Sequence, residues 1–133
     1  METDVPRPIL AILNSSEDLL ELLAEAFKDE GFGVITHHLL PFRRGQEDVT
    51  QFFAQHRPDV AIWELSIPYN DNWTFFHRTR QAPAVRDCPI ILTSTNVTRL
   101  RQAADADIDA FEVVGKPFDL DQLVALARQA LRS

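Results

Sequence analysis

The sequence has little of several features that mark particular classes of protein. Cys88 is its only cysteine, which excludes an internal disulfide and is typical of a reducing compartment. There are four glycines, and neither a GxGxxG nor a GxxxxGK motif occurs, so the common phosphate-binding loops are excluded. No serine stands in a G-x-S-x-G motif, which leaves a serine hydrolase without support.

An excess of positive charge and long apolar runs are also missing. The formal net charge is −7 at pH 7, which argues against nucleic acid or an anionic membrane as the main partner. No apolar run approaches the length that spans a bilayer, and the first residues, METDVPRP, lack the basic and apolar regions of a signal peptide. We therefore expect a cytoplasmic protein with no membrane partner. The arginines are scattered among acids and are mostly expected on solvated helix faces (Arg43, Arg44, Arg78, Arg80, Arg99 and Arg101).

What the chain does contain is an alternation of short apolar runs and amphipathic segments. A length of 133 residues fits one domain, which we place at 9–132 behind an extended or disordered lead-in at 1–8. The alternation occurs five times, which predicts an α/β fold with a five-stranded parallel sheet and helices on both faces, a doubly wound arrangement. The predicted strands are Ile9–Leu13, Phe32–Thr36, Val60–Trp63, Ile90–Leu92 and Ala110–Val114.

The predicted helices follow these strands. The first begins within Asn14–Asp18, ends before Gly31 and is expected to turn one apolar face inward. Leu39–Gln46 is expected to be a loop and Tyr69–Asn72 a turn. The inward face of the first helix is assigned to Leu19, Leu22, Leu23, Ala26 and Phe27. The later helices are predicted at Glu47–His56, Trp73–Arg80, Val97–Ala106 and Asp119–Leu131.

Polar side chains follow four of the predicted strands. The buried run ends at a single acid, Glu64, and the other strands end at Asn14-Ser15, Ser94 and Lys116. In an open α/β sheet, ligands and reactive groups lie just outside the carboxyl ends of the strands. Right-handed crossovers bring these ends to one side of the sheet, so we expect a carboxylate, a hydroxyl and an ammonium group to converge there.

In these residues the chain resembles the receiver domains of two-component response regulators. Ser94 lies 30 residues after Glu64, and Lys116 lies 22 residues after Ser94, spacings that are customary in this family. Lys116-Pro117-Phe118 matches the closing motif of receivers, and the similarity runs from about Ile9 to Leu131. The resemblance implies the flavodoxin-like strand order 2-1-3-4-5.

The sequence departs from the receiver pattern at three places. Receivers carry an acidic pair where this chain has Asn14 and Ser15, and a phospho-accepting Asp where it has Glu64. The aromatic residue of the signalling switch, three positions before the lysine, is Val113. With one acid where the family has three, we expect Mg²⁺ binding to be lost or weak, no other cofactor or metal, and no catalytic residue.

These departures lead to a hypothesis about the pocket. Glu64 is one methylene longer than Asp, so it is expected to reach Lys116 and form an ion pair, with the Ser94 hydroxyl as a second candidate partner. Such a pair would lock one conformation permanently; the alternative is that it only holds the strand ends together. His37 and His38 are expected to be exposed polar residues rather than metal ligands, because neighbours on a strand point to opposite faces.

The sequence therefore predicts a degenerate, non-enzymatic receiver domain that acts through protein contacts, independently of phosphorylation. The resemblance implies a contact surface on the fourth helix, fifth strand and fifth helix, used for a signalling partner, an effector or a homodimer. Two alternatives remain: a receiver that is still phosphorylated in an unusual pocket, and a flavodoxin-like domain that binds a small anion or nucleotide.

Overall fold

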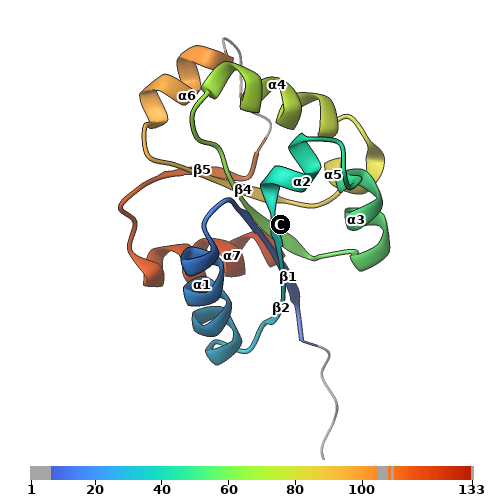
Figure 1. Ribbon diagram of the computed structural model, residues 1–133. Coiled ribbons are helices and arrows are strands. Elements are labelled where there is room, and N and C mark those ends of the chain that lie inside the picture. Colours follow the sequence, from blue (N-terminus) through green and yellow to red (C-terminus); the bar gives the residue numbers. More distant parts are fainter. Residues whose placement is uncertain (1–6, 105–107, 109, 133) are drawn as a thin grey trace, which may run out of the picture.

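A computed structural model describes residues 7–104, 108 and 110–132 of the chain. Its five strands form one parallel sheet in the order β2-β1-β3-β4-β5, which confirms the predicted topology (Figure 1). The strands are β1 (Ile9–Asn14), β2 (Gly33–His38), β3 (Val60–Glu64), β4 (Ile90–Ser94) and β5 (Glu112–Gly115). The helices within the described residues are α1 (Glu17–Asp29), α2 (Leu39–Arg43), α3 (Val49–His56), α4 (Tyr69–Thr79), α5 (Pro83–Arg86), α6 (Val97–Ala104) and α7 (Leu120–Leu131).

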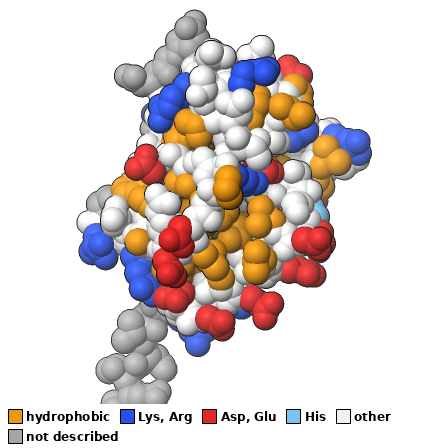
Figure 2. All heavy atoms as spheres, turned by 90° about the vertical axis from the view of Figure 1, so that its left-hand side faces the viewer, with side chains coloured by type: hydrophobic (Ala, Val, Ile, Leu, Met, Phe, Trp, Pro, Cys, Tyr) orange, Lys and Arg blue, Asp and Glu red, His pale blue; other side chains and the backbone are white. Residues whose placement is uncertain are grey.

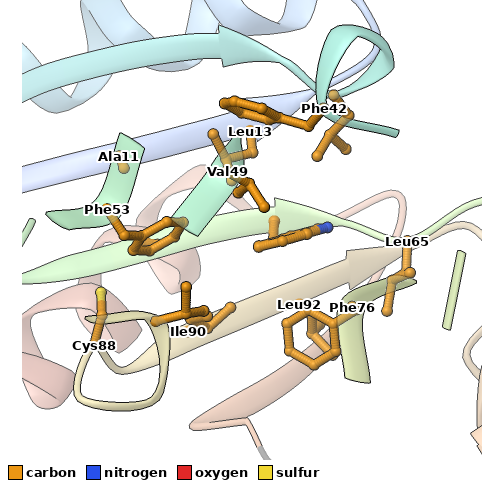
Figure 3. Packing of buried hydrophobic residues seen from close by; sticks show 14 of the residues in the cluster. Ala11, Leu13, Phe42, Val49, Phe53, Leu65, Phe76, Cys88, Ile90 and Leu92 are labelled. Atoms are coloured by element: carbon orange, nitrogen blue, oxygen red, sulfur yellow. The ribbon is translucent and has the colours of Figure 1, made fainter. Parts of the chain in front are cut away.

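Apolar cores cover both faces of the sheet. On one face, side chains of β1, β3 and β4 pack against α2 to α6; in Figure 3 Phe76 lies beside Leu92, and Phe53 lies further along the same apolar layer. On the other face the sheet packs against α1 and α7, with Phe27 and Leu123 fully buried. Since both faces are covered, the middle strands are apolar at nearly every position, as the run Val60–Trp63 indicates.

Helix α1 begins and ends near its predicted limits but turns a different face inward. The Ser16 side chain caps it by accepting a hydrogen bond from the Leu19 amide at 3.3 Å. Leu20, Leu23 and Phe27 are buried, whereas Leu22 is 59% exposed, so placing Leu22 in the core was wrong. Figure 2, seen from the left-hand side of Figure 1, shows apolar side chains in its lower half with acidic ones on both sides of them.

Two segments predicted as irregular are helical. The expected loop at Leu39–Gln46 contains α2, because Leu39 and Phe42 are buried one turn apart and Pro41 lies in the first turn, where its missing N–H costs nothing. The expected turn at Tyr69–Asn72 is the first turn of α4, whose side chains Tyr69 and Asn72 are buried.

The remaining boundaries differ by a few residues. Asp48 caps α3 and Asp119 caps α7, so α3 starts at Val49 rather than at the predicted Glu47, and α7 starts at Leu120 rather than at Asp119. Helix α6 is described to Ala104; residues 105 and 106, where the sequence predicts its end, lie outside the described residues. Among the helices described, none combines the length and apolar character needed to cross a bilayer.

Cys88 lies between α5 and β4 and is buried, at 4% exposure. Burial raises the pKa of its thiol to about 12. Because thiolate is the reactive form, we expect the native protein to resist a thiol reagent such as DTNB at pH 8, with reaction at least ~100-fold slower than in urea-unfolded chain. Equal rates in the native and unfolded states would contradict this placement of Cys88.

Candidate functional site

Glu64 ends β3 at the carboxyl edge of the sheet and is the centre of a polar cluster. Its Oε2 accepts a hydrogen bond from the Lys116 ammonium at 2.5 Å. Its Oε1 accepts from the Ser15 hydroxyl at 2.8 Å and from the Ser15 amide at 3.4 Å. The Glu64 and Lys116 side chains are only 10% and 16% exposed, so the predicted ion pair is present and largely buried.

The backbone positions both partners of Glu64. Ser15 directly follows β1, which is the neighbour of β3 in the sheet. Lys116 follows β5, and its amide donates to the Ser94 carbonyl at 2.7 Å, which holds the β5–α7 connection against the end of β4. Three strand ends therefore meet through one carboxylate.

The electrostatics of this cluster favour an ionised Glu64. Burial alone would raise the pKa of the Glu64 carboxyl. The hydrogen bonds from Lys116 and Ser15, together with the positive charge of Lys116, outweigh that effect and leave the pKa below its ordinary value of 4.5. The carboxylate is thus charged at neutral pH and satisfied on both oxygens.

Asn14, the last residue of β1, serves the local backbone. It is 1% exposed, and its Oδ1 accepts a hydrogen bond from the Ser16 amide at 2.8 Å, just before α1 begins. This is the turn chemistry expected of Asn at a helix start. The amide oxygen of Asn14 is therefore already engaged within its own turn.

Ser94 lies at the end of β4 but makes a different contact from the one considered from sequence. Its hydroxyl is 3.3 Å from the Tyr69 hydroxyl and accepts from the Asn96 amide at 3.2 Å; no hydrogen bond to Glu64 is found. The suggested Ser94–Glu64 bond was therefore wrong. The Ser94 hydroxyl is instead engaged by Tyr69, a buried side chain from the first turn of α4.

Tyr69 is the residue of this region that sequence reasoning missed. Its side chain is 5% exposed, and its hydroxyl lies 3.2 Å from the Thr95 hydroxyl as well as near Ser94. The guanidinium of Arg99 lies 5.8 Å from the ring centroid, a cation–π distance. The available signal was that Tyr69 is the only tyrosine and follows Pro68, at the start of a helix.

Val113 lies in the middle of β5 and packs with the core on the α4–α6 side of the sheet. Phe111 packs with the core on the opposite side, towards α1 and α7. The nearby aromatic ring is thus separated from Ser94 by the sheet, and the aromatic side chain that does approach Ser94 is Tyr69.

The donor set of this site does not suit Mg²⁺. The ion prefers several carboxylate and water oxygens, yet Glu64 is the single acid here, and both of its oxygens already accept hydrogen bonds. Lys116 adds a positive charge within 2.5 Å of the same carboxylate. No group of three or more His, Cys, Asp or Glu side chains suited to a metal is found among the described residues.

Comparison with known proteins identifies response regulators among the relatives. The chain is 29% identical over 121 residues to the KDP operon transcriptional regulatory protein KdpE of Escherichia coli, covering 91% of the chain and 50% of KdpE. It is 29% identical over 126 residues to the phosphate regulon transcriptional regulatory protein PhoB of Rhizobium meliloti, covering 94% of the chain and 52% of PhoB. The chain thus spans about half the length of these two relatives.

Solved structures give the same fold. A putative response regulator from Chloroflexus aurantiacus superposes with a TM-score of 0.74 at 22% identity, covering 96% of this chain and 100% of that one. No family model matches the sequence. The sheet order, the structural neighbours and the sequence relatives together support a response regulator receiver domain as the class of this chain.

Proposed function

We propose that the chain is a signalling domain of the receiver type that works without phosphorylation and without Mg²⁺, through contacts with a protein partner. The observation that carries this proposal is the state of Glu64. In receivers the corresponding position is an Asp that attacks a phosphoryl donor. Here it is a longer carboxylate, buried and already bonded to Ser15 and Lys116.

Phosphoryl transfer needs a free carboxylate oxygen and a cation that neutralises the moving charge. Glu64 meets these requirements poorly, because each of its oxygens already accepts a hydrogen bond and the neighbouring positions that are acidic in receivers are the neutral Asn14 and Ser15. A carboxylate carries one negative charge where a phosphoryl group carries nearly two. The single charge of Lys116 therefore balances Glu64.

The same contacts suggest a constitutive conformation. Glu64 links the end of β1 through Ser15 and the end of β5 through Lys116, which are the strand ends that a phosphoryl group would otherwise draw together. The Tyr69 hydroxyl contacts Ser94. In this proposal Tyr69 takes the position beside Ser94 that the aromatic switch residue of receivers would otherwise occupy, and Val113 on β5 has no such role. We propose that the site is locked and that signalling depends on the amount or availability of the protein.

For the partner we propose the face formed by α6, β5 and α7, as the receiver resemblance implies, with a signalling protein, an effector or a second copy as the occupant. Arg99 and Arg101 on α6 and Glu112 on β5 are exposed there and have opposite charges. In this proposal the domain is cytoplasmic, non-catalytic and binds neither nucleic acid nor membrane.

Acetyl phosphate with Mg²⁺, followed by intact-mass measurement, tests the proposal. We expect no phosphoryl adduct on the protein and no shift in melting temperature with Mg²⁺ and beryllofluoride. The matched control is the triple variant N14D/S15D/E64D, which restores three acids and is expected to acquire an adduct or a beryllofluoride-dependent shift.

A stoichiometric adduct on Glu64 of the unmodified chain would overturn the proposal in favour of a phosphorylatable receiver. Stabilisation by a nucleotide or a small anion, with no adduct, would instead favour a flavodoxin-like binding domain. The thermal-shift series therefore separates the three functions in one set of measurements.

A further inference from the structure

Strand β2 forms an open edge of the sheet. Within the described residues it pairs with β1 alone, and its other side meets no strand (Figure 1). Gly33 donates its amide to the Pro8 carbonyl at 2.9 Å, so by alternation Gly33, Ile35 and His37 direct their backbone groups towards β1. Val34 and Thr36 therefore direct an N–H and a C=O each away from the sheet.

This edge lacks the usual protection against pairing. Natural edge strands are commonly shielded by lysine, proline, a bulge or shortness. Strand β2 has six residues in regular register with β1, and its sequence GVITHH contains no proline, lysine or acid. The opposite edge strand, β5, is shorter and begins with the exposed Glu112.

A hollow lies on each side of the β2 edge, and the two differ in chemistry. The hollow towards α1, of about 450 Å³, is lined by Thr36 and His38 and by three glutamates and one lysine of the helix, Glu17, Glu21, Glu25 and Lys28. The hollow towards α3, of about 960 Å³, is lined by Ile35 and by aromatic side chains of α2, α3 and α4 (Phe42, Phe52 and Phe75). The α1 side is acidic, whereas the α3 side combines these three phenylalanines with polar and charged side chains, among them Glu47, Asp48 and Arg78.

We propose that β2 binds an extended segment of a partner protein in which basic residues alternate with apolar or aromatic ones. A strand added to β2 would hydrogen-bond to the outward groups of Val34 and Thr36. Its successive side chains would point alternately to the two faces of the sheet. The basic ones would then meet Glu21 and Glu25, and the apolar ones would enter the hollow beside Phe52 and Phe75.

A second copy of this chain fits the edge less well. Antiparallel pairing of β2 with β2 of another copy places the two-fold axis perpendicular to the sheet, which keeps equivalent faces on the same side. The acidic hollows would then adjoin each other, bringing Glu21 and Glu25 of both copies together. Like charges at such an interface oppose association, so the charge pattern favours a basic partner.

The test uses a seven-residue peptide in which lysine alternates with phenylalanine or valine, titrated into the full chain. The control peptide has the same composition, with its lysines grouped at one end. We expect the alternating peptide to shift the Val34 and Thr36 amide signals in ¹⁵N–¹H NMR spectra and to bind at least ~10-fold more tightly than the control. Equal binding of the two peptides would show only general attraction to an acidic protein and would overturn the proposal.

Variants locate the contact. Thr36→Pro removes one outward donor without touching the ladder to β1 and is expected to weaken binding on the order of tenfold. Glu25→Lys is expected to weaken it several-fold, whereas Glu112→Lys, the same charge change at the other edge, is expected to have a clearly smaller effect. If the two charge reversals weaken binding equally, or if the Val34 and Thr36 amide signals do not shift at saturating peptide, β2 is excluded as the binding site. Both measurements can be made whether or not the Thr36→Pro variant folds.

Discussion

Replacing Lys116 by methionine is expected to lower the free energy of unfolding by roughly 2–3 kcal/mol at pH 7. The substitution keeps an unbranched side chain that lacks only the terminal ammonium position, and it leaves the Glu64 carboxylate largely buried without its cation. Breaking a fully buried ion pair would lower the free energy of unfolding further. Here Lys116 is 16% exposed, so water reaches the pair and the loss of stability is smaller. Urea denaturation followed by circular dichroism measures the change.

Lys28, the other lysine of the chain, provides the matched control. It is exposed in the last turn of α1, so Lys28→Met is expected to change stability by no more than about 0.5 kcal/mol. The double variant K116M/E64M removes the unpaired charge as well and is expected to regain most of the stability. Similar losses for Lys116→Met and Lys28→Met would show that the ion pair contributes little.

The pH dependence of the Lys116 variant follows from the same contacts. In the native chain the pKa of Glu64 is below its ordinary value of 4.5, so its stabilising contribution is present above that value and is lost as the pH falls through the lower folded pKa. Without Lys116, burial raises the pKa of Glu64 with less to oppose it. Protonation of Glu64 then removes the cost of burying a charge without its cation. The difference in the free energy of unfolding between the native chain and the Lys116→Met variant should therefore become smaller from pH 7 to pH 4. A difference that stays constant over this pH range would contradict the prediction.

Replacing Arg80 by methionine is the second large expected effect, a loss of about 2–4 kcal/mol. Arg80 is 5% exposed, and its Nη1 donates to the carbonyls of Val85 at 2.6 Å and Cys88 at 2.7 Å. The variant leaves these carbonyls without a strong donor at the point where α5 leads into β4. Thermal unfolding monitored by circular dichroism measures the loss.

Arg78→Met is the matched control for Arg80. Arg78 lies two residues before Arg80, in the last turn of α4, is exposed, and its replacement is expected to change stability by less than about 0.5 kcal/mol. Because both variants remove one arginine from the end of α4 or the residue that caps it, the difference between them reports burial and hydrogen bonding rather than net charge. A destabilisation by Arg80→Met no larger than that by Arg78→Met would contradict the structural role of Arg80.

The sheet and its polar edge were predictable because both depend on repeated local patterns. Five apolar runs alternating with amphipathic segments leave few arrangements, and right-handed crossovers then bring the carboxyl ends of the strands together. The contact between Glu64 and Lys116 followed from this topology, since each residue directly ends or follows a strand. The alternation predicted the parallel sheet and its polar edge, and the resemblance to receiver domains supplied the strand order.

The errors concern side chains whose surroundings come from distant parts of the chain. Arg80 was expected in solvent because arginine usually lies there, and the carbonyls that bind it come from a turn with no sequence signature. Leu22 was assigned to the core by a 3–4 spacing that Leu20 satisfies equally well. Helix α2 was missed because Pro41 and Gly45 indicate a loop unless the burial of Leu39 and Phe42 is known.

Trp63 gives the site a built-in optical reporter. The indole is 1% exposed, lies between Phe53 and Phe76 at ring-centroid distances of 6.2 and 5.0 Å, and is adjacent in sequence to Glu64. A rearrangement that moves the end of β3 would therefore also move a fluorophore held in an apolar environment. Emission of the unlabelled protein is thus sensitive both to unfolding and to ligand binding at the strand ends, with Trp73→Phe isolating its signal.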